Sequence, residues 1–299
     1  MSAPPPERTL RWSGWTDRGR VRQNNEDAFL GLQFDAREVR HLGKIGDGST
    51  AHDDYVFAVS DGMGGAKSGE FASRIAVEKI TRLLPRSYRQ TAAGLDAGID
   101  DVLAELFEQI HRALSFLGES YEECAGMGAT LSLCWFTPER MFFAHIGDSR
   151  IYYLPADGSA LRQLTADDTH VGWLLRNGKI NEREARNHPR KNVLQKALGA
   201  GNQFVAPQVG AVVFEPGDRF LLCTDGVIDG FRDELLLEHL HAPIPDGKSA
   251  AQILVEAAVQ ASGRDNTTAL IVEALRGLDH ANPSRGCGNG RMPADFTVP

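Results

Sequence analysis

The stretch YVFAVSDGMGG, residues 55–65, places an apolar run directly before an aspartate and a cluster of glycines. Such a run is typical of a β-strand. Asp61 then stands at the strand end, where its carboxylate is half desolvated and needs a compensating charge, such as a cation. Gly62, Gly64 and Gly65 let backbone atoms approach a ligand closely. This stretch therefore predicts a strand that ends in a cation site.

Three further aspartates stand in the same context. Asp148 and Asp225 each follow an apolar run, and Asp265 comes shortly before the strand-like run 268–274. An Asp-Gly pair alone is most often a surface turn. Four acids at strand edges in one domain favour a shared cation site instead. Because these donors are hard oxygens without neighbouring histidine or cysteine, they favour Mg²⁺ or Mn²⁺ over zinc.

The polar stretch 17–27, DRGRVRQNNED, lies between two strand-like runs and is expected to be the loop of an N-terminal hairpin. Alone it would be an ordinary polar loop. Beside a cation site, Glu26 and Asp27 would act on the ions through water, and a guanidinium would hold a pair of phosphoryl oxygens. Two cations and an arginine clamp suit hydrolysis of a phosphate ester.

Composition excludes several classes of protein. The 299 residues carry 32 basic and 40 acidic side chains, a net charge of −8. This balance argues against a dedicated binder of nucleic acid or of an anionic membrane. The N-terminus lacks the pattern of a signal peptide, and no apolar run reaches the roughly 18 residues of a membrane span. The four cysteines show no CxxC spacing and are expected to be thiols, so we expect a cytoplasmic protein.

The remaining pattern predicts one α+β domain, residues 9–276, between flexible ends at 1–8 and 277–299. Strands are expected at 10–15, 28–34, 55–60, 130–136, 140–146, 151–154, 209–214, 219–223 and 268–274, and helical periodicity covers 72–84, 95–117 and 250–261. Without regular βα alternation, the sheets should be antiparallel with segregated helices.

Three connections stand out within this domain. The tight GDSR at 147–150 reads as the turn of a hairpin between 140–146 and 151–154. The polar, basic stretch 157–202 is either a solvated surface excursion or a flap that recruits an acidic or phosphorylated partner. Residues 35–54 are longer than a simple hairpin connection and are expected to be a surface insertion.

Seven short motifs occur in one order along the chain: 22–27, 61–65, 126–130, 147–150, 164–167, 224–226 and 265–266. Together they resemble the metal-dependent protein phosphatases of the PPM family, type 2C, in its bacterial serine/threonine branch. The resemblance covers residues 10–275 and implies a four-layer αββα sandwich of two antiparallel sheets flanked by helices. Residues 167–202 would form the family's variable flap.

The resemblance also assigns roles to site residues. Asp61 would bridge two Mg²⁺ or Mn²⁺ ions, the Gly62 carbonyl would complete the site of the first ion, and Asp225 and Asp265 would hold the second. Glu26 and Asp27 would act through water, Arg22 would bind the substrate phosphate, and Asp148 would join Asp225 in a third metal site.

Two positions depart from the family pattern. Met63 stands where some members carry a histidine proposed as general acid, as is common in the bacterial branch. Asp168 stands where many relatives have histidine, and this extra acid is expected to alter third-ion binding or substrate preference.

The expected activity is hydrolysis of phosphoserine or phosphothreonine on proteins phosphorylated by a serine/threonine kinase, and on the kinase itself. The protein is expected to be a monomer that binds neither nucleic acid nor membrane. The alternatives are a phosphatase dedicated to an anti-sigma antagonist and a non-catalytic pseudophosphatase scaffold, although such scaffolds typically lose the metal-binding aspartates.

Overall fold

The computed structural model describes residues 8–35, 37–65, 68–92, 98–158, 160–203 and 205–277. The predicted flexible ends lie outside this range apart from Arg8 and Gly277, and Cys287 also lies outside it. The strands are β1 (Arg8–Asp17), β2 (Asp27–Phe34), β3 (Val39–His41), β4 (Ile45–Ser49), β5 (Asp54–Met63), β6 (Gly128–Ala129), β7 (Leu131–Phe136), β8 (Met141–Ile146), β9 (Arg150–Leu154), β10 (Arg162–Gln163), β11 (Leu198–Gly199), β12 (Gln208–Val212), β13 (Arg219–Cys223) and β14 (Thr267–Arg276). The helices are α1 (Ser68–Ala92), α2 (Ile99–Ser120), the 3-10 helix η1 (Glu122–Cys124), α3 (His170–Arg176), α4 (Glu182–Arg186), α5 (Asp225–Gly230), α6 (Asp233–His241) and α7 (Ala250–Ala261).

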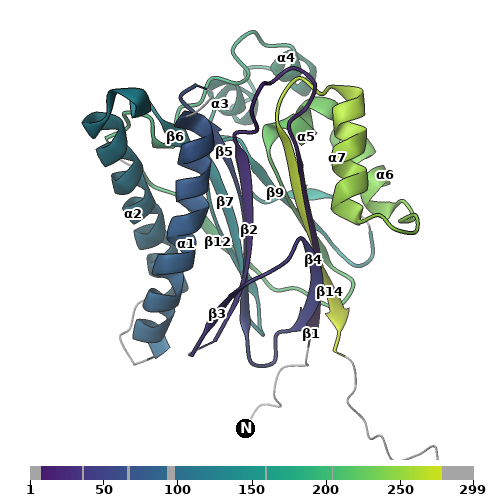
Figure 1. The fold of residues 1–299 in the computed structure, drawn as a ribbon. Coiled ribbons are helices and arrows are strands. Elements are labelled where there is room, and N and C mark those ends of the chain that lie inside the picture. Colours follow the sequence, from purple (N-terminus) through teal and green to yellow (C-terminus); the bar gives the residue numbers. More distant parts are fainter. Residues whose placement is uncertain are drawn as a thin grey trace, which may run out of the picture.

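Two antiparallel sheets form the centre of the molecule (Figure 1). One has the strand order β10-β9-β13-β14-β1-β4. The other has the order β11-β6-β5-β7-β8-β12, with β2 paired to both β5 and β3. Helices α1 and α2 cover the outer face of the second sheet, whereas α5, α6 and α7 cover the first (Figure 1). The predicted α+β sandwich with four αββα layers is thereby confirmed.

Three layers of buried side chains separate these four layers. Strand β5 shows why its run is continuously apolar: Tyr55, Phe57 and Val59 face the core between the sheets, whereas Val56 and Ala58 face α1 and α2. Side chains of a strand alternate between faces, so a strand covered on both sides carries apolar residues throughout. A third apolar core lies between the first sheet and α5–α7.

Both predicted hairpins are wrong, for the same reason. Strand β8 pairs with β7 and β12 in one sheet, but β9 pairs with β13 and β10 in the other. Likewise β1 and β2 lie in different sheets. The connections 18–26 and 147–149 therefore cross from one sheet to the other. We call them the first crossing and the second crossing. Both crossings lie at the end of the sandwich where β5 ends and α5 begins, at the top of Figure 1.

The 35–54 connection is more than a surface insertion. It contributes β3, which extends β2, and β4, which pairs with β1 at the edge of the other sheet. Both are short and largely exposed, which suits edge strands. Each predicted helical stretch corresponds to a helix, namely α1, α2 and α7, although residues 95–97 of the second stretch lie outside the described residues. The described helices include none long and apolar enough to cross a bilayer.

Candidate metal centre

The end of β5 brings two acids together across adjacent strands. Asp61 lies directly opposite Asp27, the first residue of β2. The Asp61 backbone is fixed by Thr130, whose Oγ1 accepts from the Asp61 N–H at 2.9 Å and whose N–H donates to the Asp61 carbonyl at 2.8 Å. These two hydrogen bonds therefore fix the backbone from which the Asp61 side chain extends.

Gly62 has no space for a side chain. A Cβ atom at this position would lie 1.9 Å from the Gly69 carbonyl oxygen in the first turn of α1. The Gly62 N–H donates to the Glu26 carbonyl oxygen at 3.1 Å, which joins the first crossing to β5. Glycine is required here because α1 and the 18–26 connection both approach the backbone closely.

Asp27 is buried, and only one of its two carboxylate oxygens has hydrogen-bond partners among the described residues. Its Oδ2 atom accepts hydrogen bonds from Thr224 Oγ1 at 2.8 Å and Thr268 Oγ1 at 2.7 Å. Its Oδ1 atom is buried without a hydrogen-bond partner among the described residues. Burial raises the pKa of Asp27 to about 7, although the two threonines oppose this shift.

Asp225 is the first residue of α5, and its carboxylate also has an oxygen without a hydrogen-bond partner among the described residues. Its Oδ1 atom is also buried and finds no partner within the described part of the chain. Burial raises the pKa of Asp225 well above its ordinary value, and the charges of Asp148 and Asp265 raise it further. An orphaned buried carboxylate oxygen is costly unless it protonates or receives a cation.

The pKa of Asp61 is raised by the charges of four other acids. Burial is the largest cause of its raised pKa, followed by the charges of Asp27, Asp225, Asp148 and Asp265. These five carboxylates come from β5, β2, the start of α5, the second crossing and the position two residues before β14. The structure thus gathers acids that are distant in sequence at one end of the sandwich.

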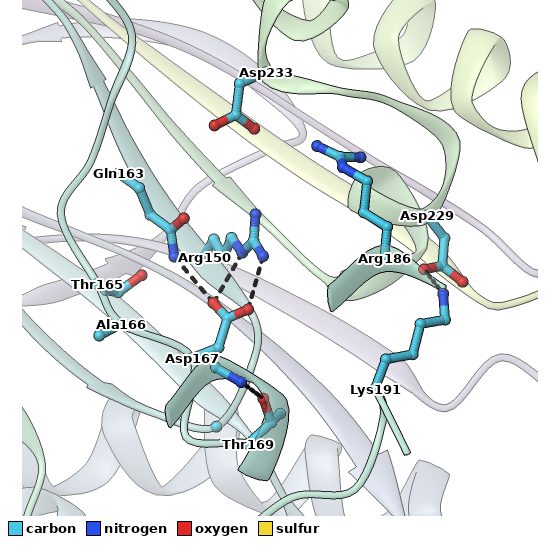
Figure 2. A network of polar contacts seen from close by, with 12 residues as sticks. Arg150, Gln163, Thr165, Ala166, Asp167, Thr169, Arg186, Lys191, Asp229 and Asp233 are labelled. Carbon is cyan, nitrogen blue, oxygen red and sulfur yellow. Dashed lines mark hydrogen bonds and ion pairs between the residues drawn. The ribbon is translucent and has the colours of Figure 1, made fainter. Parts of the chain in front are cut away.

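Asp148 sits on the second crossing, and burial raises its pKa to about 7. The charge of Asp167 adds to this shift, whereas Arg150 opposes it. Arg150 and Asp167 form a two-pronged pair, Nε to Oδ1 at 2.8 Å and Nη2 to Oδ2 at 2.7 Å (Figure 2). Since Asp167 is committed to Arg150, Asp148 is left as the acid available to a ligand.

Arg22 and Asp265 contact each other directly. Arg22 Nη2 donates to Asp265 Oδ2 at 2.7 Å, and this bond raises the pKa of Arg22. Glu26 lies in the same electrostatic environment: burial raises its pKa, and the charge of Arg22 lowers it. The predicted phosphate-binding arginine therefore neutralises one of the predicted metal-binding acids in this arrangement.

Three residues with supporting roles were not identified from the sequence. Thr224 and Thr268 orient Asp27, as described above. Asn266 accepts from the Glu26 N–H at 2.8 Å and donates to the Arg18 and Asn24 carbonyl oxygens, each at 2.9 Å. Asn266 therefore attaches the first crossing to the start of β14 by three hydrogen bonds. Its place in the 265–266 motif was a signal, but its partners lie about 240 positions away.

These residues fit divalent cations. Two buried carboxylate oxygens have no partner among the described residues, the charges of four neighbouring acids raise the pKa of Asp61, and all the donors are hard oxygens. In the arrangement of the described residues, no three Asp, Glu, His or Cys side chains form a group that could hold a metal ion. Asp265 Oδ2 instead accepts a hydrogen bond from Arg22 Nη2.

A cleft of about 410 Å³ extends from this centre. Asp148 and Asp225 line one part of it, α3, α4 and Lys191 of the 167–202 segment line another, and α5 and Asp233 complete it. Lys191 Nζ contacts Asp229 Oδ1 of α5 at 2.5 Å and so joins the segment to the opposite wall (Figure 2).

Comparison with known proteins identifies similar chains. Residues 44–244 match the profile of the family "Protein phosphatase 2C". The serine/threonine protein phosphatase PstP of Mycobacterium tuberculosis is 34% identical over 270 residues, which cover 89% of this chain but 45% of PstP. The serine/threonine phosphatase stp of Listeria innocua is 34% identical over 259 residues, 86% of this chain and 93% of that protein. This chain thus spans less than half of PstP and nearly all of stp.

Solved structures give the same result. The crystal structure of M. tuberculosis PstP/Ppp has a TM-score of 0.69 and 32% identity, covering 90% of this chain and all of that chain. The PstP catalytic domain in complex with two manganese ions also has a TM-score of 0.69, with 31% identity, covering 90% of this chain and 99% of that one.

Proposed function

The chain belongs to the protein phosphatase 2C family, and we propose that it is a metal-dependent phosphatase that hydrolyses phosphoserine and phosphothreonine on proteins. The observation that carries this proposal is the convergence of Asp61, Asp225 and their neighbouring acids around orphaned carboxylate oxygens. The two manganese ions of the PstP catalytic domain support Mn²⁺ or Mg²⁺ as the bound cations.

Each side chain has a proposed task. Asp61 and the Gly62 carbonyl would hold a first ion, and Asp61, Asp225 and Asp265 a second. Asp148 with Asp225 would hold a third. When bound, the cations supply the Lewis acidity that lowers the pKa of the attacking water. Asp27, oriented by its two threonines, and Glu26 would hold water molecules around these ions.

Arg22 would bind the substrate phosphate. Its side chain is 48% exposed and already presents a charged donor at the edge of the acid cluster. A guanidinium matches two phosphoryl oxygens with parallel hydrogen bonds and stabilises charge that develops on them. Met63 offers no proton to the leaving group, so that proton must come from water in the site.

The cleft supports a protein substrate. It continues from Asp148 and Asp225 between α5 and the 167–202 segment, so a chain that carries the phosphorylated residue can lie along it. We propose substrates of a serine/threonine kinase, and the kinase itself, as partners of a monomeric enzyme. A cytoplasmic location also remains a proposal, supported by three buried free thiols, Cys124, Cys134 and Cys223.

Retention of the acids favours catalysis over a scaffold role. The test uses the metal-stripped chain, titrated with Mn²⁺ and Mg²⁺, on p-nitrophenyl phosphate and a phosphothreonine peptide. We expect activity that depends on the added cation. Asp61→Asn and Asp225→Asn should each reduce it by ~1,000-fold or more, since a cation contributes several kcal/mol to the transition state.

Asp246→Asn is the matched control, because Asp246 is exposed and lies in the connection before α7. This variant should retain wild-type activity. Full activity of Asp225→Asn, or full wild-type activity in EDTA, would overturn the proposal. Hydrolysis of p-nitrophenyl phosphate without hydrolysis of any phosphoprotein would overturn the assignment to protein substrates.

A further inference from the structure

Residues 194–196 of the 167–202 segment return to Asp168 and Thr169 near its start. Thr169 forms an antiparallel bridge with Leu194, and the Gln195 N–H donates to the Asp168 carbonyl oxygen at 2.7 Å. Lys196 Nζ lies 3.4 Å from Asp168 Oδ1. Residues 168–169 and 194–196 thus form a narrow neck, from which α3 and α4 extend.

The same aspartate is bonded to the second crossing. Gly147 N–H donates to Asp168 Oδ2 at 3.2 Å, and the Asp168 N–H donates to the Gly147 carbonyl oxygen at 2.7 Å. Asp168 is only 7% exposed. Both of its carboxylate oxygens are therefore engaged, one by the crossing and one by the neck.

Gly147 has a backbone conformation that favours glycine. Its φ is +113°, and a Cβ atom would lie 2.6 Å from the Thr130 side chain, so the position excludes other residues. His145 Nε2 also contacts the Gly147 carbonyl oxygen at 3.0 Å, while Ser132 Oγ lies 2.8 Å from His145 Nδ1. Burial lowers the pKa of His145, which favours the neutral ring that can donate through Nε2.

These contacts connect the two walls of the cleft. Gly147 immediately precedes Asp148 on one wall, whereas Thr169, Val171 and Arg186 of the segment line another. The neck is attached to the crossing between these walls. Asp168 makes that attachment through its backbone and its side chain.

We propose that Asp168 is a positioning residue that fastens the neck of the 167–202 segment to the Gly147–Asp148 crossing and thereby sets the width of the substrate cleft. Its kinetic consequence rests on the proposed phosphatase function. A long peptide must pass between the two walls, whereas a small aryl phosphate needs only the metal centre. Asp168 therefore acts mainly on peptide substrates.

The first measurement is amide hydrogen exchange in the metal-free protein, which requires no activity. The variants are Asp168→Ala, Asp168→Asn and Lys196→Met, with Asp246→Asn as control. Asp168→Ala should accelerate exchange at least fivefold at residue 147 and across 169–194. Lys196→Met and Asp168→Asn should do so mainly across 169–194, since Asp168→Asn keeps an acceptor for the Gly147 N–H.

The second measurement compares kcat/KM for a phosphothreonine peptide and for p-nitrophenyl phosphate. In Asp168→Ala, the loss for the peptide should exceed the loss for the aryl phosphate at least fivefold, mainly through KM. Lys196→Met should shift the same ratio in the same direction and keeps the test intact if Asp168→Ala fails to fold.

Unchanged exchange in all three variants would overturn the proposal, as would equal losses for both substrates, which indicate a merely structural role. If the wild type hydrolyses neither substrate, the proposed function fails. In that case the exchange data alone decide whether Asp168 fastens the neck.

Discussion

Buried carboxylates outside the metal centre also affect this protein. Asp54, at the start of β5, is 8% exposed and accepts a hydrogen bond from Trp135 Nε1 at 2.8 Å. Burial raises the pKa of Asp54 to about 6, despite that bond. Above this pH the folded protein must keep a poorly solvated charge that the unfolded chain exposes to water. Asp54 therefore lowers stability at neutral pH.

We predict that Asp54→Asn stabilises the protein at pH 7.5 by ~1–3 kcal/mol, since a pKa shift of about two units corresponds to ~3 kcal/mol at most. The amide oxygen can still accept from Trp135. Because the folded pKa lies above the unfolded value of about 3.9, the wild type recovers stability as the pH falls from 7 to 4. The gap between variant and wild type in urea denaturation should shrink over that range, and a gap independent of pH would contradict this account.

Arg22 carries a separate prediction. Arg22→Met should lower kcat/KM for a phosphothreonine peptide by ~10–150-fold, the cost of losing charge-assisted hydrogen bonds worth about 1.5–3 kcal/mol. Mn²⁺ affinity, measured by calorimetry, should not weaken, because the substitution releases Asp265 from its 2.7 Å contact with Arg22. Arg22→Lys should recover only part of the activity, since lysine cannot make the two-pronged contact. Weaker Mn²⁺ binding in Arg22→Met would instead place Arg22 among the groups that shape the metal centre.

At the scale of single elements, the two crossings contribute to the metal centre together with the strands and helices. The 18–26 and 147–149 connections each pass from one sheet to the other, and each carries one acid, Glu26 or Asp148, to the same end of the sandwich. Asn266 and Asp168 hold these connections by hydrogen bonds to their backbones. Irregular segments thus acquire the fixed geometry that a metal centre requires.

Helix α7 provides a test of how the elements are anchored. Ser249 caps α7, and its side chain accepts from the Gln252 N–H at 3.2 Å. Ser249→Ala should reduce the free energy of unfolding by ~1 kcal/mol, because a helix N-terminal donor loses its partner. Ser249→Thr should restore most of it. Thermal denaturation measures both, and an unchanged midpoint in Ser249→Ala would show that the cap contributes nothing.

At the scale of the whole molecule, the first and last strands lie side by side within the first sheet. Strand β1 pairs with β14 over its full length, from Arg8 opposite Arg276 to Asp17 opposite Thr267. This pairing supports the proposal that residues 9–276 fold as one domain. The core between the two sheets contains an aromatic cluster in which Phe136 contacts Phe57, Phe214 and Phe220 with ring centroids 5.2–5.9 Å apart.

Phe136→Ala should therefore destabilise the protein by ~3–5 kcal/mol, the usual cost of removing a buried aromatic ring. Phe116 is the matched control, since it is 64% exposed on α2, and Phe116→Ala should change stability by less than ~0.5 kcal/mol. Urea denaturation followed by far-ultraviolet circular dichroism gives both values. Similar losses in the two variants would contradict the assignment of Phe136 to the shared core.

Much of the candidate site was predictable because it depends on local pattern. The acids Asp61, Asp148, Asp225 and Asp265 each stand beside an apolar run. Burial of such a run as a strand places the adjoining residue at the end of that strand. The roles of Thr224, Thr268 and Asn266 were not predictable in this way. Their partners lie roughly 200 or more positions away, and no local periodicity marks them.

The sequence by itself determined nine of the strands, the three longest helices and the kind of chemistry, because side-chain period and residue type are local properties. Only the tertiary structure decided which strands share a sheet, since a tight turn such as 147–149 is compatible with either a hairpin or a crossing. It also decided that Asp168 is bonded to Gly147 and Lys196, and that Arg22 contacts Asp265. Those contacts arise from the packing of two sheets against each other, which brings distant residues together.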